Sequence, residues 1–167
     1  TVADGVDYTA NIAITDVAGN SGSSNTDTFS MDNTDPSATI TSDVVWENDG
    51  VVTVTWTASD ATSGINTCTL TLSHATEDDQ TADCSDGNGS ADFTVADGTD
   101  YTANIAIADI AGNTGSSNTD TFSADNTDPV ASIDTQPADN NNNNDDATFT
   151  FSGTDATSGV ASFECSF

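Results

Sequence analysis

A long stretch of this sequence occurs twice. Residues 1–36 (TVADGVDYTANIAITDVAGNSGSSNTDTFSMDNTDP) recur as residues 94–129 with five substitutions, an offset of 93 residues. A shorter pair, SDATSGI at 59–65 and TDATSGV at 154–160, is offset by 95 residues. A repeat of this length exceeds the roughly 20–45 residues of a solenoid unit and matches a small domain with its own core. The sequence therefore predicts an array of similar domains, which we call modules.

The repeat divides the chain into three parts. Residues 1–36 are predicted to be the C-terminal half of one module, 37–129 a complete module, and 130–167 the N-terminal part of a further one. Both boundaries follow the same five residues, DNTDP, which we interpret as a linker. Because the first residue is not Met and the last residues are largely apolar, we expect the chain to be part of a longer one.

Charge restricts the partners of this protein. The sequence has no Lys or Arg and 28 acidic residues, a formal net charge of −28. Nucleic acids and anionic membrane surfaces are bound through cationic side chains, so both are excluded as expected partners. No stretch approaches the roughly 20 apolar residues of a membrane span, so we expect no direct membrane insertion. Solvent, salt or metal ions must neutralise the carboxylates, which favours an extracellular or cell-surface setting that is saline or rich in calcium.

The acidic residues are mostly of the type that favours turns over helices. Only Glu47, Glu77 and Glu164 are Glu, and the remaining acidic residues are Asp. With abundant Thr, Ser, Asn and Gly, this composition favours strands joined by tight loops. Disorder is the alternative, because low hydrophobicity and high net charge are its signature. The regular alternation of the apolar residues argues against it.

Apolar alternation predicts the strands of the complete module. In residues 51–58 (VVTVTWTA), Val52, Val54 and Trp56 fall on one face. Further strands are predicted at 37–41, around 68–72, at 91–95, at 101–108 and at 119–124, with a weak one near Cys84. About seven strands in a module of this size match an immunoglobulin-like sandwich. The predicted fold class is all-β, with tandem seven-stranded sandwiches.

Three segments carry a resemblance to known families. VTVTWTASD at 52–60 resembles the Trp-bearing B strand of fibronectin type III domains. VADGTDY at 95–101, followed by TANIAIADIAGNTG, resembles that family's turn, tyrosine corner, F strand and F–G loop, with Asp97 where the family usually has Pro. FECS at 163–166 and the D-x-AGN loop resemble bacterial Ig-like repeats of large secreted, adhesin-like surface proteins. The resemblance implies a fold more than an activity.

The aromatic residues have structural roles in this interpretation. A Tyr at the start of an inward-facing strand can bury its ring and hydrogen-bond the preceding turn. We therefore expect Tyr8 and Tyr101 to be core and corner residues, and Trp56 to anchor the core.

The cysteines predict one disulfide per module. Cys68 and Cys84 can close a loop of roughly 15 residues, and the acidic segment between them is interpreted as a loop. Cys165 is taken as the counterpart of Cys68, with its partner beyond Phe167. Three buried free thiols are the alternative. A disulfide would indicate an oxidising location.

Aspartates of separate loops are expected to meet at the linkers. In a sandwich, the B–C loop (60–64) and the F–G loop (109–115) lie at one end, beside the entering linker and near the preceding turn at 4–7. The residues expected to converge are Asp32, Asp35, Asp60 and Asp109 at the first linker, and Asp125, Asp128 and Asp155 at the second. Clustered carboxylates without a cationic side chain form a hard oxygen site that suits Ca²⁺. The alternative is that these Asp residues cap turns, and that Pro36 and Pro129 alone set the linker angle.

The remaining motifs give weaker indications of a function. His74, the single His, is expected in a solvated polar loop, and the Asp pairs recur in copies without aromatic platforms, so we expect no enzyme. Asn88-Gly89-Ser90 is a candidate N-glycosylation site. The run Asn140–Asn144 is interpreted as an expanded loop.

The predicted function is a structural module of a secreted or surface-anchored prokaryotic protein. It would form a stalk, filament or sheath, with neighbouring identical modules as its partners. The alternatives are a calcium-dependent adhesive module that binds a surface glycan or protein, and an accessory domain of a secreted hydrolase. Loops without aromatic residues favour the structural role over glycan binding. Assembly could also proceed by strand exchange between molecules, since the terminal parts carry complementary strands.

Overall fold

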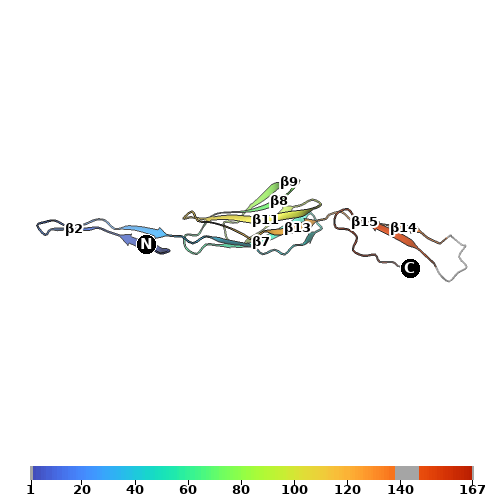
Figure 1. The fold of residues 1–167 in the computed structure, drawn as a ribbon, viewed down its shortest axis with the longest axis horizontal. Helices are drawn as coiled ribbons and strands as arrows, with labels where there is room; N and C mark the ends of the chain where they lie inside the picture. The colour runs from blue at the N-terminus through green and yellow to red at the C-terminus, as the bar shows by residue number, and fades with distance from the viewer. Residues whose placement is uncertain (1, 138–146, 167) are drawn as a thin grey trace.

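The structure, a computed structural model, describes residues 2–137 and 147–166, and all of their regular elements are β-strands. The Asn run at 140–144 lies outside the described residues. Figure 1 shows three parts in a row: an N-terminal segment (residues 2–36), in which the β2–β3 pairing lies between β1 and β4 as the continuation of one long hairpin, a central unit (residues 37–129) and a C-terminal segment (130–137 and 147–166). None of the described residues belongs to a helix that is long and apolar enough to cross a membrane.

The central unit consists of two antiparallel sheets, apart from one short parallel pairing. The first sheet has the order β10-β7-β5, made of β5 (Ser37–Ile40), β7 (Val51–Ser59) and β10 (Gly89–Thr94). The second has the order β6-β13-β11-β8-β9, made of β6 (Trp46–Glu47), β8 (Ile65–His74), β9 (Glu77–Asp83), β11 (Gly98–Asp109) and β13 (Asp120–Ala124), with β12 (Thr114–Ser116) paired to the end of β11. The short parallel pairing joins β6 to β13. Apart from β9, the longer strands lie where the alternation predicts them, whereas β6, β9 and β12 were not predicted.

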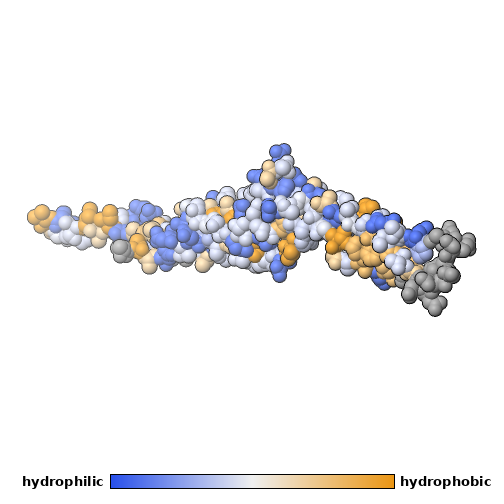
Figure 2. All heavy atoms as spheres, turned by 45° about the vertical axis from the view of Figure 1, so that its right-hand side comes forward, coloured by the Kyte–Doolittle hydropathy of each residue, from blue (hydrophilic) through white to orange (hydrophobic). Residues whose placement is uncertain are grey.

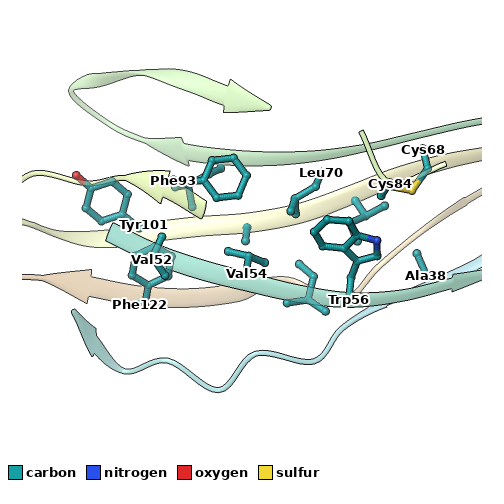
Figure 3. Close-up of a cluster of buried hydrophobic side chains, with 14 of the residues drawn as sticks. Ala38, Val52, Val54, Trp56, Cys68, Leu70, Cys84, Phe93, Tyr101 and Phe122 are labelled. Carbon is teal, nitrogen blue, oxygen red and sulfur yellow. A yellow bond between two sulfur atoms is a disulfide. The ribbon is translucent and has the colours of Figure 1, made fainter. Parts of the chain in front are cut away.

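The core lies between these sheets, as the alternation predicts. Exposed and buried residues alternate along β7, with Val52, Val54 and Trp56 facing Leu70 and Tyr101 of the other sheet (Figure 3). Burial of each large apolar side chain contributes about 1.5–3 kcal/mol. Trp56 also donates from Nε1 to the Gly87 carbonyl at 2.8 Å, so its polar edge is satisfied inside the core. The predicted role of Trp56 as a core anchor is confirmed.

Tyr101 forms the predicted corner and has an unexpected neighbour. Its hydroxyl lies 2.7 Å from Glu77 Oε1 and 3.1 Å from the Ala96 carbonyl of the preceding turn. The His74 ring stacks on the Tyr101 ring, with centroids 4.3 Å apart, and His74 Nε2 lies 3.0 Å from the Thr99 carbonyl. The prediction of a solvated loop for His74 is therefore wrong. β8 runs through His74, and that places the imidazole over the phenol.

The acidic segment between the two cysteines is a strand, not the predicted loop. Its β9 pairs with β8 over Thr69↔Asp83 to His74↔Glu77, because the two strands form a hairpin at the sheet edge. Cys68 and Cys84 form the predicted disulfide, with Cα atoms 4.8 Å apart, and the Cys84 N–H donates to the Cys68 carbonyl. The disulfide joins neighbouring segments of one sheet rather than the two sheets.

The N-terminal segment repeats the strand pairings of the central unit. Its strands are β1 (Gly5–Ala10), β2 (Ala13–Thr15), β3 (Ser21–Ser23) and β4 (Asp27–Met31). Tyr8 pairs with Phe29 as Tyr101 pairs with Phe122, and the Tyr8 hydroxyl donates to the Ala3 carbonyl at 2.8 Å. The predicted corner is thus present in both copies of the repeat, but Tyr8 is only half-buried and does not belong to the core as Tyr101 does.

The C-terminal segment repeats the β5–β7 pairing. β14 (Val130–Thr135) pairs with β15 (Thr150–Thr154), and Ile133 opposes Phe151 as Ile40 opposes Trp56. Cys165 is free and exposed. Counted from the shared ATSG motif, Phe163 rather than Cys165 occupies the place of Cys68, and its ring lies 5.0 Å from that of Phe151. The predicted equivalence of Cys165 and Cys68 is wrong by two residues.

We predict that replacing both disulfide cysteines (Cys68→Ser with Cys84→Ser) lowers the free energy of unfolding. The loss should be about 3 kcal/mol, because the bond closes a loop of some 15 residues in the unfolded chain. Urea unfolding measures it, with Cys165→Ser as the control that should match the parent. A double variant with the parent's urea midpoint would contradict this expectation.

Tyr101 should make the central unit sensitive to alkali. Burial, followed by the nearby Glu77 carboxylate, raises the pKa of Tyr101 from 10.0 to about 12. Because the pKa is higher in the folded state, the associated stability is fully present below pH 10 and decreases as pH rises toward 12. Urea midpoints between about pH 9 and 12 should therefore decrease more steeply in the parent than in Tyr101→Phe. Parallel curves for the two proteins would refute this role.

Candidate metal centre at the first linker

Three aspartates from separate elements meet where the N-terminal segment enters the central unit. One carboxylate oxygen from each of Asp32, Asp60 and Asp109 lies within 4.8 Å of the others. Asp32 belongs to the linker, Asp60 follows β7 and Asp109 ends β11. The structure thus brings together three of the four residues expected here. Asp35 is exposed and is not in this group.

Asp109 is completely buried and held by its own loop. Its Oδ1 accepts the N–H groups of Gly112 at 2.6 Å and Asn113 at 2.8 Å, and its Oδ2 accepts Asn113 Nδ2 at 2.7 Å. Burial alone would raise the pKa of Asp109, but these hydrogen bonds outweigh it and lower the pKa below 3.8. The buried carboxylate is therefore ionised at neutral pH, although no cationic side chain faces it.

Asp60 supplies a carboxylate oxygen without a partner. Its Oδ1 accepts the N–H groups of Thr62 at 3.2 Å and Gly64 at 2.7 Å. Its Oδ2 is buried and has no hydrogen-bond partner among the described residues. An unsatisfied buried polar atom costs about 1–3 kcal/mol, and more when it is charged. A cation between the three carboxylates would remove this cost.

Hydrogen bonds and close packing hold the linker at the joint, in addition to the backbone restriction that its proline imposes. Asp32 Oδ2 accepts the Ser63 N–H at 3.0 Å, and Asn113 Nδ2 lies 3.3 Å from the carbonyls of Asp32 and Thr34. Pro36 is buried, and a Cβ at Gly115 would lie 2.2 Å from its carbonyl oxygen. The linker geometry therefore depends on these contacts, and not on Pro36 alone.

Sequence reasoning placed the turn at 4–7 near this joint but gave Asp4 no role in it, and it missed Asn113 and Gly115. Asp4 accepts hydrogen bonds from the Asn33 N–H at 3.0 Å and from the Thr34 hydroxyl, while Asn113 and Gly115 act as described above. Each lies in the repeated stretch: Asp97 makes the same two kinds of contact with Asn126 and Thr127. A search of the repeat for polar residues and glycines outside the acidic pattern would have identified them.

The second linker contains two of the three carboxylates of such a site. Asp125 Oδ2 accepts the Ser158 N–H at 2.9 Å, and Asp155 Oδ1 accepts the Gly159 N–H at 2.7 Å. Asp155 Oδ2 is buried without a hydrogen-bond partner in the described residues, as Asp60 Oδ2 is. Asp128 is exposed and makes no such contact in this part of the structure. Within the described residues, only the first linker gathers three acidic side chains.

The donor set at the first linker suits a hard divalent cation. All three side chains offer oxygen, and the sequence contains no Lys or Arg that could neutralise them. Ca²⁺ takes six to eight oxygen ligands in flexible geometry, including carboxylates, carbonyls and water. The unpartnered Asp60 Oδ2 shows that the residues present fit such an ion.

The candidate glycosylation site lies elsewhere. Asn88 is exposed in the turn before β10, and its Oδ1 accepts the Ala58 N–H at 3.2 Å. Glycosylation of Asn88 remains a prediction.

No protein-family model matches this sequence, and no curated protein matches it either.

We predict that Gly115→Ala destabilises the joint. The new methyl group would overlap the Pro36 carbonyl, a backbone atom that cannot rotate away, at a cost of about 1–3 kcal/mol. Thermal melting measures the loss, with Ser116→Ala on the exposed neighbouring position as the control. Equal melting temperatures for the two variants would show that the linker does not pack as described.

Proposed function

We propose that this protein is a non-catalytic structural repeat of a prokaryotic surface or secreted protein. In this proposal, residues 37–129 form an Ig-like or fibronectin type III-like sandwich, and modules of this kind follow one another in a stalk, filament or sheath. Ca²⁺ bound by Asp32, Asp60 and Asp109 stiffens the joint between consecutive modules.

The observation that carries the proposal is the unpartnered, buried Asp60 Oδ2 among three converging carboxylates. The three side chains come from the linker and from two loops of the central unit, so an ion there would hold the linker to the unit. Asp32, Asp60 and Asp109 would be the ligands, and the ion would neutralise their mutual repulsion. A rigid joint would hold consecutive modules in a fixed relative orientation, as a stalk requires.

The extracellular setting has independent support. The Cys68–Cys84 disulfide fits an oxidising compartment. A chain with a net charge of −28 and no cationic side chain repels itself in low salt, and millimolar calcium with saline outside a cell reduces that repulsion.

Calcium should raise the melting temperature of the protein. At a calcium concentration of about 100 times Kd, ligand linkage contributes about 2.7 kcal/mol, which raises the melting temperature of a domain of roughly 100 residues by about 10–20 °C. Differential scanning calorimetry with calcium and with EDTA measures the shift. Asp60→Asn should lose most of it, and in EDTA the variant should be no less stable than the parent because one buried charge is removed.

The matched control is Asp35→Asn. Asp35 lies in the same linker but outside the carboxylate group, so this variant should keep the full calcium shift. If calcium leaves the parent's melting temperature unchanged, or shifts Asp60→Asn equally, the metal proposal fails.

A further inference from the structure

The first and last strand segments of the central unit run side by side in the same direction. β6 and β13 pair in parallel. The Ser123 N–H donates to the Val45 carbonyl at 3.1 Å. The Asp125 N–H donates to the Glu47 carbonyl at 2.8 Å, and both bonds join residues 78 positions apart. The pairing therefore links the segment that enters the unit to the segment that leaves it.

Side chains extend the same alignment toward β5. The Asn118 amide pairs with both backbone groups of Ile40: Oδ1 accepts the Ile40 N–H at 2.8 Å, and Nδ2 donates to the Ile40 carbonyl at 3.4 Å. The Ser42 hydroxyl donates to Asp120 Oδ2 at 3.3 Å. Both contacts again span 78 residues, so these side chains continue the register of the β6–β13 pair. The Asn118 amide takes the place that a backbone peptide group has in a regular strand pair.

The aligned segments lie along the line that joins the two linkers. Figure 1 shows the central unit between the N-terminal and C-terminal segments, and the turned view of Figure 2 shows the same row. At the entering end, Pro36 lies against Gly115. At the leaving end, Asn126 Nδ2 donates to the Val95 carbonyl at 3.2 Å. Tension between the linkers would therefore pull β5 toward one end of the unit and β13 toward the other.

Hydrogen bonds in this arrangement resist tension together. When two parallel segments are pulled from opposite ends, all the bonds between them are sheared at once. In a hairpin that is opened from its free end, by contrast, the bonds break one after another. The rate of unfolding under force should therefore depend on the bonds between residues 40–47 and 118–125 more than on any other pairing of the unit.

We propose that residues 40–47 and 118–125 form a clamp by which the central unit bears tension between its linkers. Asn118 completes the clamp, because its amide joins the end of β5 to the segment before β13. This inference rests on the proposed role as an element of a stalk or filament, since only such a role puts the chain under tension. It does not depend on calcium.

The first test is single-molecule force spectroscopy on the 167-residue chain, held at its two ends. The measured quantity is the rate at which the central unit unfolds at a constant force. Asn118→Ala should raise this rate about tenfold, because it removes two hydrogen bonds of the clamp. Asn118 is exposed, so the variant should remain folded without force. A rate equal to the parent's would overturn the proposal.

The matched control is Asn88→Ala. Asn88 is also exposed, and its Oδ1 also accepts a backbone N–H, that of Ala58 at 3.2 Å, but it lies outside the clamp. This variant should unfold under force at the parent's rate, even where it lowers the urea midpoint as much as Asn118→Ala does. If the two variants unfold equally fast under force, the clamp is refuted, since Asn118 then acts like any other side chain that binds the backbone.

The disulfide identifies the unfolding step of the central unit. Cys68 and Cys84 are 16 residues apart in the sequence, and neither belongs to the clamp. With a reducing agent present, unfolding exposes the bond, and its cleavage should add a further extension of roughly 50 Å. If no such extension follows the step that Asn118→Ala accelerates, that step belongs to another part of the chain, and the proposal is overturned.

Calcium separates this inference from the proposed metal site. The clamp contains none of Asp32, Asp60 and Asp109, so Asn118→Ala should keep the calcium shift in melting temperature. If calcium leaves the parent's melting temperature unchanged while Asn118→Ala still unfolds about tenfold faster under force, the metal site fails and the clamp stands. If calcium raises the melting temperature but Asn118→Ala unfolds under force like the parent, the clamp fails and the metal site stands.

Discussion

The constraint on which this structure depends is the absence of any cationic side chain beside 28 acidic ones. With no Lys or Arg available, the carboxylates are satisfied by backbone N–H groups, amides and hydroxyls. Asp109, Asp60 and Asp32 each accept backbone N–H groups of tight loops, and Asp4 accepts one from the linker. The acidic residues thus hold the loops through hydrogen bonds. The free-energy cost of crowding and burying negative charges is largest where carboxylates converge, so a divalent cation would stabilise the structure most at those positions.

The linker joint and the hydrophobic core are connected through one strand, β11. β11 contributes Tyr101 and Ile105 to the core, and it ends in Asp109, which lies beside the linker. The buried face of β11 therefore also carries the carboxylate that lies at the joint. In the proposed array, this arrangement would couple the stability of each unit to the geometry of its neighbour.

Much of the fold was predictable because its signals are local. Alternation located β5, β7, β8, β10, β11 and β13, and the Cys68–Cys84 pairing followed from spacing. Loop topology was sufficient to expect Asp32, Asp60 and Asp109 together. The hairpin of β8 and β9 was missed because its edge strand is acidic on both faces and carries no apolar alternation. The stacking of His74 on Tyr101 was missed because that contact exists only once the hairpin has formed.

The sequence by itself determined the repeat, the strand periodicity, the charge and the candidate metal ligands, because each follows from composition or from the spacing of residues. Tertiary structure alone decided that Asp35 and Asp128 are exposed in the linkers rather than part of the carboxylate groups, that Gly115 is pressed against Pro36, and that Asp60 Oδ2 has no partner among the described residues. Burial is a property of neighbours distant in the chain, and no local pattern of residues specifies it.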